Sequence, residues 1–195
     1  MNALPGTTGR RRIYLMRHGH VDYLHPRVAE TGDTKSVPLT RLGREQATAS
    51  GQALAHVRFD IAISSGYPRT RETLDLVLAR NEHEVPPHEH EPDLVELHGG
   101  RMQALRSRRE LAAAMTFQFD AAAQPGARMF EGGELFADAL ARAERAILRL
   151  LARPDWHTAV VTAHEGINRV VLGWMTGNGL AAVQTFEQDL ACIDI

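Results

Sequence analysis

Short apolar runs rich in strand-forming residues alternate along this chain with longer stretches of helical periodicity. Three of the runs are typical of buried strands, at Arg12–Met16, Phe59–Ser64 and Thr158–Thr162. A further strand is predicted from Leu190 to Ile195. Because the sequence stops inside this strand, whether the natural chain continues past Ile195 stays open.

Helices are predicted between these strands. Thr40 is a suitable N-cap for a helix that runs to about His56, and Pro68 suits the first turn of the next helix. Apolar residues recur at helical spacing from Phe136 to Leu151, before Pro154. A last helix is expected from about Gly166 to Gly177. Strands that alternate with helices predict a three-layer α/β/α sandwich around a mainly parallel sheet.

Two segments fall outside this alternation. Residues 1–11 are expected to form a mobile N-terminal arm, and residues 12–195 a single domain. Residues 81–92 contain three prolines and are expected to be mostly loop, with room for one short strand. Residues 93–133 are the least regular stretch, which we interpret as a cap insertion over the functional site.

Composition narrows the class of protein. A hydrophobic share of 44% and a charged share of 24% are those of a soluble globular domain. The net charge of -2 gives no overall attraction for nucleic acid, and no stretch is long and apolar enough for a membrane span. The single cysteine, Cys192, cannot form an internal disulfide, so a reducing cytoplasm is expected.

Unusual polar motifs follow the three predicted parallel strands. Arg17-His18-Gly19 ends the first strand, Ser64-Ser65-Gly66 ends the second with Arg69 just beyond, and His164-Glu165-Gly166 follows the third. Ligands of open parallel sheets bind beyond the carboxyl ends of the strands. We therefore expect the motifs to converge, bringing together two arginines and two histidines around a tetrahedral dianion.

These residue types suit phosphoryl transfer without a metal or cofactor. Arg17 and Arg69 can donate bidentate hydrogen bonds to phosphate oxygens. A neutral His18 can attack phosphorus through one ring nitrogen if a backbone carbonyl holds the proton on the other. Gly19 would allow close backbone approach to the phosphate, and the helix start at Gly166 would add backbone donors. Glu96, in the returning loop, is the candidate general acid, because burial there would raise its pKa.

The histidines leave other hypotheses open. His18 and His20 could form a metal pair on a strand end, although no third ligand with fitting spacing is present and Arg17 would repel a cation. His88 and His90 could form a weak surface metal site, with plain solvent exposure as the alternative. His20 and His25 are candidate substrate-binding residues because they lie close to His18.

A cluster of cap arginines, Arg101, Arg106, Arg108 and Arg109, is either a solvated helix face or a rim that attracts anions.

Five segments, in this order and spacing, carry a resemblance to a known family: LMRHG at 15–19, PLTRLGREQA at 38–47, SSGYPRTRET at 64–73, GGEL at 132–135 and VVTAHEGINRVVL at 160–172. They resemble the histidine phosphatase superfamily, in the branch of cofactor-dependent phosphoglycerate mutases and their phosphatase relatives. The resemblance covers nearly the whole chain from Arg12 onward. It implies a phosphohistidine intermediate on His18, phosphate binding by Arg17, Arg69 and His164, and Glu96 as the proton donor.

The chain also departs from the family pattern. Val21 and Leu24 stand where a Thr and an Asn are usual in the family. The pocket therefore either lacks two polar contacts, or His20, Asp22 or His25 supplies them. Leu135 replaces a usual Ser, which we interpret as structural. Glu96 is followed by Leu97-His98-Gly99-Gly100 rather than by the mutase pattern.

The departure after Glu96 and a chain shorter than a typical mutase favour a phosphatase over a mutase, but neither identifies the substrate. A small phosphorylated metabolite is the expected substrate. A mutase and a catalytically weak module that binds phosphorylated ligands remain as alternatives, and the oligomeric state, including a homodimer, stays open.

Overall fold

The computed structural model describes residues 10–31, 33–100, 107–189, 191 and 193–194. Its sheet has the strand order β3-β2-β4-β1-β5, formed by His88–His90, Ile61–Ser64, Thr158–Ala163, Arg12–Arg17 and Ile193–Asp194. β1 pairs with β4, β4 with β2, and β2 with β3 in parallel, whereas β5 pairs antiparallel with β1. The parallel strands therefore all end at the same edge of the sheet.

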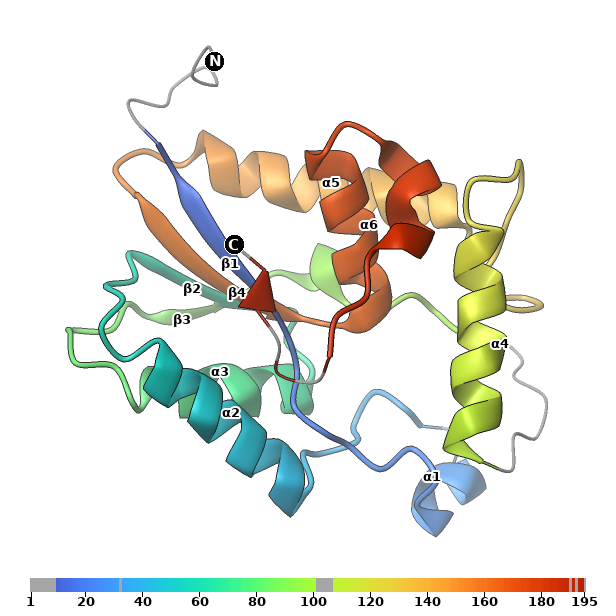
Figure 1. Cartoon of the computed structure of the whole chain (residues 1–195), viewed down its shortest axis with the longest axis horizontal. Helices are drawn as coiled ribbons and strands as arrows, with labels where there is room; N and C mark the ends of the chain where they lie inside the picture. Colours follow the sequence, from blue (N-terminus) through green and yellow to red (C-terminus); the bar gives the residue numbers. More distant parts are fainter. Residues whose placement is uncertain (1–9, 32, 101–106, 190, 192, 195) are drawn as a thin grey trace.

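Helices cover both faces of this sheet (Figure 1). α2 (Arg41–Ala53) and α3 (Pro68–Leu78) lie on one face, and α5 (Phe136–Ala152) and α6 (Glu165–Met175) lie on the other. Short turns of 3-10 helix, η1 (Pro92–Leu94) and η2 (Gly179–Thr185), contact α5 and α6. The arrangement confirms the predicted three-layer α/β/α sandwich.

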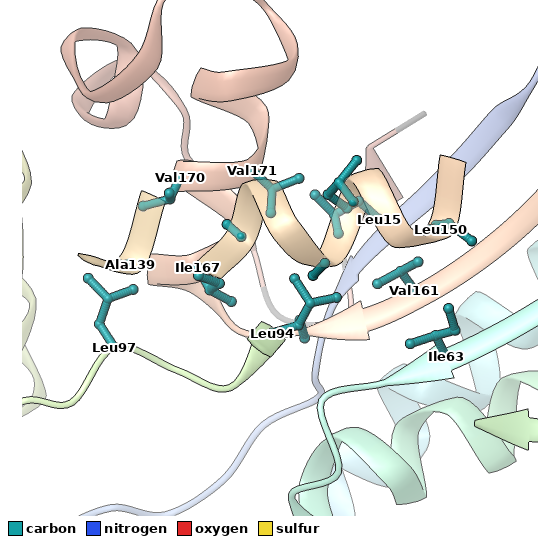
Figure 2. Packing of buried hydrophobic residues seen from close by; sticks show 14 of the residues in the cluster. Leu15, Ile63, Leu94, Leu97, Ala139, Leu150, Val161, Ile167, Val170 and Val171 are labelled. Atoms are coloured by element: carbon teal, nitrogen blue, oxygen red, sulfur yellow. The ribbon is translucent and has the colours of Figure 1, made fainter. Parts of the chain in front are cut away.

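Alternating residues of β1 divide the core into two parts. Leu15 belongs to the cluster that packs against α5 and α6, together with Ile63 of β2 and Val161 of β4 (Figure 2). Tyr14 and Met16 point to the opposite face, where they join Leu54, directly after α2, and residues of α3. Successive side chains of a strand alternate between its faces, so one short apolar run can serve both layers.

The first turn of α2 lies directly against the loop that follows β1. Thr40 caps this helix by accepting from the backbone N–H of Gly43 at 3.2 Å, as its position predicts. A Cβ on Gly43 would lie 2.2 Å from the carbonyl oxygen of His20, and one on Gly19 would lie 2.4 Å from that of Gly43. Glycine at both positions is what allows helix and loop to approach, and this contact fixes the backbone beside His18.

The structure corrects several expected boundaries. The region from 93 to 133 is more regular than expected, because it contains α4 (Arg108–Asp120). Ser107 caps α4 by accepting from the N–H of Glu110 at 3.2 Å, and a Ser followed three residues later by Glu is a helix-start signal that the sequence did contain. α1 (Pro26–Thr31) occupies part of the loop after β1. The expected final strand is seen at Ile193–Asp194, whereas Ala191 lies in a turn with a φ of 56°; residues 190, 192 and 195 lie outside the described residues.

At the other end of the chain, Arg11 is held on the domain. Its guanidinium donates to the carbonyls of Leu151 at 2.6 Å and Arg153 at 2.8 Å, and it lies 4.5 Å from the ring centroid of Trp156. Its contacts join Arg11 to the domain, whereas residues 1–9 of the expected arm lie outside the described part of the chain. Among the helices of the described residues, none is long and apolar enough to cross a membrane.

Candidate active site

The ends of β1, β2 and β4 bring the three sequence motifs together. His18 follows β1 and His164 follows β4, and their ring centroids are 5.2 Å apart. Tyr67, after β2, places its ring centroid 5.1 Å from that of His164 and 4.9 Å from the guanidinium carbon of Arg69. The side chains of His18, His164, Tyr67 and Arg69 therefore form one continuous series of contacts, each with the next.

The ring of His18 is oriented by its own chain. Its Nδ1 lies 2.7 Å from the carbonyl oxygen of Gly19, which fixes the proton on Nδ1 and leaves Nε2 with a free lone pair. The side chain is 2% exposed. Burial, followed by the charge of Arg69, holds the pKa of His18 well below its ordinary range. A buried neutral imidazole with one nitrogen free is the form required of a nucleophile.

The ring of His164 is oriented by a neighbouring serine hydroxyl. Its Nε2 lies 2.8 Å from the hydroxyl of Ser65, which in turn lies 3.0 Å from that of Thr70. Burial and the charge of Arg69 keep the pKa of His164 well below its usual value. Its Nδ1 is buried and has no hydrogen-bond partner within the described part of the chain. Buried polar atoms are seldom left without partners, so this nitrogen is a candidate contact for a bound oxyanion.

Arg69 is the largest fully buried side chain of the described residues, at 2% exposure. Its guanidinium donates to the carbonyls of Thr34 at 2.9 Å and Lys35 at 3.2 Å, and it lies 5.7 Å from the ring centroid of Tyr23. Its Nε has no partner among the described residues. A buried cation without a paired carboxylate is costly unless an anion joins it, which is the state expected of a phosphate-binding arginine.

Arg17 is arranged differently, because it already pairs with an anion. Its guanidinium lies 2.9 Å from a carboxylate oxygen of Glu165 and donates to the backbone carbonyl of Gln188 at 2.8 Å. The other carboxylate oxygen of Glu165 accepts from Arg169 at 2.8 Å. Glu165 therefore bridges two arginines at the edge of the site.

Glu96 reaches the N-terminus of α6. Its carboxylate accepts from the backbone N–H groups of Gly166 at 3.2 Å, Ile167 at 3.1 Å and Leu97 at 3.0 Å. Burial raises the pKa of Glu96, while these backbone donors act in the opposite direction. The predicted phosphate donor at Gly166 is thus engaged by the predicted acid in this structure, and both lie at one point of the site.

The other predicted site residues have structural contacts. The N–H of Gly19 donates to the hydroxyl of Thr73 in α3 at 3.1 Å, and the same glycine packs closely against Gly43 of α2. The ring of His20 lies 2.8 Å from the hydroxyl of Thr40, at the start of α2, and His25 is exposed where α1 begins. Val21 is buried with Val37 and Leu39, so its departure from the family pattern fills an apolar cluster. Leu24 is 42% exposed.

Four residues that shape the site were not predicted, although Tyr67 lies inside the SSGYPRTRET segment and Glu134 inside the GGEL segment. Tyr23 and Tyr67 lie against Arg69, and burial raises the pKa of both phenols. Arg142 of α5 donates to the carbonyls of Asp93 at 2.6 Å and Val95 at 2.7 Å, directly before Glu96. Glu134 binds Arg142 at 2.7 Å and accepts from the N–H of His98 at 3.1 Å. A charged residue on the otherwise apolar face of α5 was the available signal for Arg142.

The histidines of β3 form hydrogen bonds of their own. His88 contacts Asp75 through Nδ1 at 2.6 Å and Ser64 through Nε2 at 2.8 Å, and His90 contacts the same serine at 3.1 Å. Both ring nitrogens of His88 are therefore engaged. Within the described residues, no group of three or more His, Cys, Asp or Glu side chains could hold a metal ion.

Only some of the cap arginines belong to the described residues. Arg101 and Arg106 lie outside the described residues, and Arg109 is exposed at the start of α4.

Known proteins resemble the chain over most of its length. A model of the histidine phosphatase superfamily (branch 1) matches residues 13–195. The adenosylcobalamin/alpha-ribazole phosphatase of Escherichia coli (strain K12) is 28% identical over 186 residues, which span 93% of this chain and 87% of that protein.

Two solved structures show the same fold. The alpha-ribazole phosphatase from Shigella flexneri superimposes with a TM-score of 0.69 at 25% identity, covering 93% of this chain and 87% of that one. A mycobacterial glucosyl-3-phosphoglycerate phosphatase in complex with inorganic phosphate gives a TM-score of 0.72 at 23% identity, over 94% of this chain and 87% of the other.

Proposed function

Because this chain belongs to the histidine phosphatase superfamily, branch 1, we propose that it hydrolyses phosphomonoesters of small metabolites through a phosphohistidine on His18. The observation that carries the proposal is the ring of His18, buried, with its Nδ1 held by the Gly19 carbonyl. The single cysteine is compatible with action in a reducing cytoplasm.

In the first step, Nε2 of His18 attacks phosphorus while the bond from phosphorus to the ester oxygen breaks. Arg17, Arg69 and His164 stabilise the charge on the remaining phosphoryl oxygens. The departing alkoxide takes a proton from Glu96, so the alcohol leaves neutral and Glu96 becomes a carboxylate. His18 now carries the phosphoryl group on Nε2 and keeps its proton on Nδ1.

In the second step, water attacks the phosphohistidine. Glu96 accepts a proton from that water, the bond from phosphorus to Nε2 breaks, and inorganic phosphate leaves. Both residues return to their starting states, so the cycle needs no further reactant. A phosphate that binds the N–H groups of Gly166 and Ile167 would displace Glu96 from them. Loss of those donors favours proton uptake by Glu96, which prepares it as an acid.

A phosphoglycerate mutase is the second candidate, since the family branch contains both activities. The named relatives are phosphatases, which favours hydrolysis. A mutase would transfer the phosphoryl group from His18 to a second hydroxyl faster than to water and would depend on a bisphosphorylated primer. A binding module would hold phosphorylated ligands without turnover.

One assay separates these functions. Phosphate release is measured over a panel of phosphorylated metabolites, with excess chelator present and with His18→Ala as the blank. We expect release by the wild type that His18→Ala abolishes and that the chelator does not affect. Isomerisation faster than phosphate release would identify a mutase. Binding without any release over the panel would identify a binding module.

A further inference from the structure

We infer that Glu165 determines substrate specificity, by placing a fixed negative charge beside the phosphate site that favours monoesters of uncharged alcohols over monoesters of acidic ones. The inference rests on the proposed phosphatase function and adds the class of substrate. It starts from a difference between the two phosphate-binding arginines: Arg17 is paired with a carboxylate at 2.9 Å, whereas Arg69 contacts carbonyls and aromatic rings.

The carboxylate of Glu165 is held in place on both sides. One oxygen faces Arg17 and the other faces Arg169, and the side chain is 17% exposed. Arg169 is itself fixed, because its guanidinium carbon lies 4.5 Å from the ring centroid of Phe119 in α4 and it is bonded to Glu165 within one turn of α6. A charge held between two arginines cannot turn away when a ligand enters.

The field of this carboxylate reaches the groups where the alcohol part of a substrate must lie. The negative charge of Glu165 contributes to raising the pKa of Glu96, the proposed proton donor to the leaving group. It acts in the same direction on the pKa of Tyr23, on the side of Arg69. The charge of Glu165 therefore acts on both groups, and its ion pair with Arg17 fixes it beside the phosphate site.

This arrangement limits how much negative charge a bound substrate can carry near its phosphate group. Arg17 and Arg69 are the cations placed at the phosphate, and Glu165 offsets one of them. A phosphate dianion still meets the guanidinium of Arg69 and the N–H groups at the start of α6. A second anionic group near phosphorus, such as a carboxylate, would lie beside the charge of Glu165, and like charges disfavour binding by about tenfold or more.

Glycerol 3-phosphate and 3-phosphoglycerate form a matched pair of probes. The first has an uncharged hydroxymethyl group at the position where the second has a carboxylate. Their inhibition constants are measured against p-nitrophenyl phosphate hydrolysis. We expect the wild type to bind glycerol 3-phosphate at least about tenfold more tightly, and Glu165→Gln to reduce this ratio to about threefold or less. Glu89→Gln removes a carboxylate that pairs with Arg153 on the exposed surface, and it should leave the ratio unchanged.

Two further arms keep the test decisive if Glu165→Gln folds poorly. The double variant Glu165→Gln/Arg169→Gln removes both partners of one ion pair and should lower the ratio as well. In the wild type, the uncharged amide of 3-phosphoglycerate should bind like glycerol 3-phosphate.

Three results would overturn the inference: a wild-type ratio near one, two probes that both fail to compete, or a ratio that loss of Glu165 leaves unchanged. Absence of His18-dependent hydrolysis of p-nitrophenyl phosphate would instead overturn the proposed function itself.

Discussion

The two ends of the site are built in different ways. At the phosphate end, His18, Arg69 and His164 are buried next to strand ends, with exposures of 2%, 2% and 0%. At the leaving-group end, Glu96 sits in a segment that Arg142 of α5 holds through backbone carbonyls. We therefore expect the proposed phosphate end to supply chemistry common to every substrate, and the leaving-group end with its neighbours to select among substrates.

Arg69→Lys tests the phosphate end and should have the largest effect. A lysine cannot reproduce the planar guanidinium between two tyrosine rings, and it loses the bidentate geometry toward phosphate. We expect kcat/KM to fall about 1,000-fold. The fall should be equal for p-nitrophenyl phosphate and for alkyl phosphates, measured by phosphate release. A loss that depends on the leaving group would contradict the division between the two ends.

Glu96→Gln tests the leaving-group end, and its effect should depend on the leaving group. Alkoxides need a proton to depart, whereas a nitrophenolate does not. We therefore expect kcat to fall about 100-fold for alkyl phosphates and only severalfold for p-nitrophenyl phosphate. Parallel assays of the two ester types give the comparison. An equal fall for both would remove Glu96 from the role of acid.

The pH dependence of activity distinguishes the two ends of the site, because each end has a group whose pKa is shifted. Burial and Arg69 lower the pKa of His18, so its ring stays neutral at a pH where an ordinary imidazole is charged. Burial raises the pKa of Glu96, so it stays protonated to higher pH than an ordinary glutamate. Activity should be lost as pH falls through the first pKa and as it rises through the second, by about tenfold per pH unit on each side. With an alkyl phosphate, Glu96→Gln should abolish the alkaline limb and retain the acid limb.

Arg142→Met examines how Glu96 is positioned. Arg142 is 9% exposed and joins Glu134 to the backbone at Asp93 and Val95, so its loss leaves the Glu134 carboxylate, whose side chain is 18% exposed, without its cation. We expect a loss of about 3 kcal/mol in the free energy of unfolding. For alkyl phosphates we also expect about tenfold lower kcat, with the alkaline limb of the pH profile shifted, because the segment that holds Glu96 is loosened.

Arg149→Met is the matched control on the same helix. Arg149 pairs with Glu91 and Asp93, but its side chain is 52% exposed. The Arg149→Met variant should lose less than about 1 kcal/mol in the free energy of unfolding and should keep the pH profile of the wild type. Chemical denaturation and the alkyl-to-aryl rate ratio measure both variants, and equal behaviour would refute the positioning role of Arg142.

Sequence patterns predicted that the residues of the proposed phosphate end would lie together, because each of them ends or follows a strand or lies at the start of a helix. Arg17 and His18 end the apolar run of β1, and Arg69 lies one residue inside the helix that Pro68 starts. The roles of Tyr67 and Arg142 could not be inferred in this way, since they depend on contacts between distant segments. α4 was missed for another reason: Ser107 and Glu110 gave a local start signal, but the neighbouring glycines and arginines suggested irregular structure.

Val21→Thr should have the smallest effect. Val21 packs with Val37 and Leu39, so the residue usual in the family would place a hydroxyl in an apolar cluster. We expect a loss of about 1 kcal/mol in stability and a change of less than about twofold in kcat. A large gain in activity would show that the loop after His18 lacks a polar contact that catalysis uses.

The most direct test of the account is to find where the phosphoryl group goes. The enzyme is mixed with a labelled phosphomonoester, quenched in base within the first turnover, and digested for mass spectrometry. The proposed mechanism predicts an acid-labile, base-stable phosphoryl group on His18 that is absent from His18→Ala and longer-lived when Glu96→Gln slows the attack of water. Steady hydrolysis without label on the wild type, or label on a different residue, would contradict it.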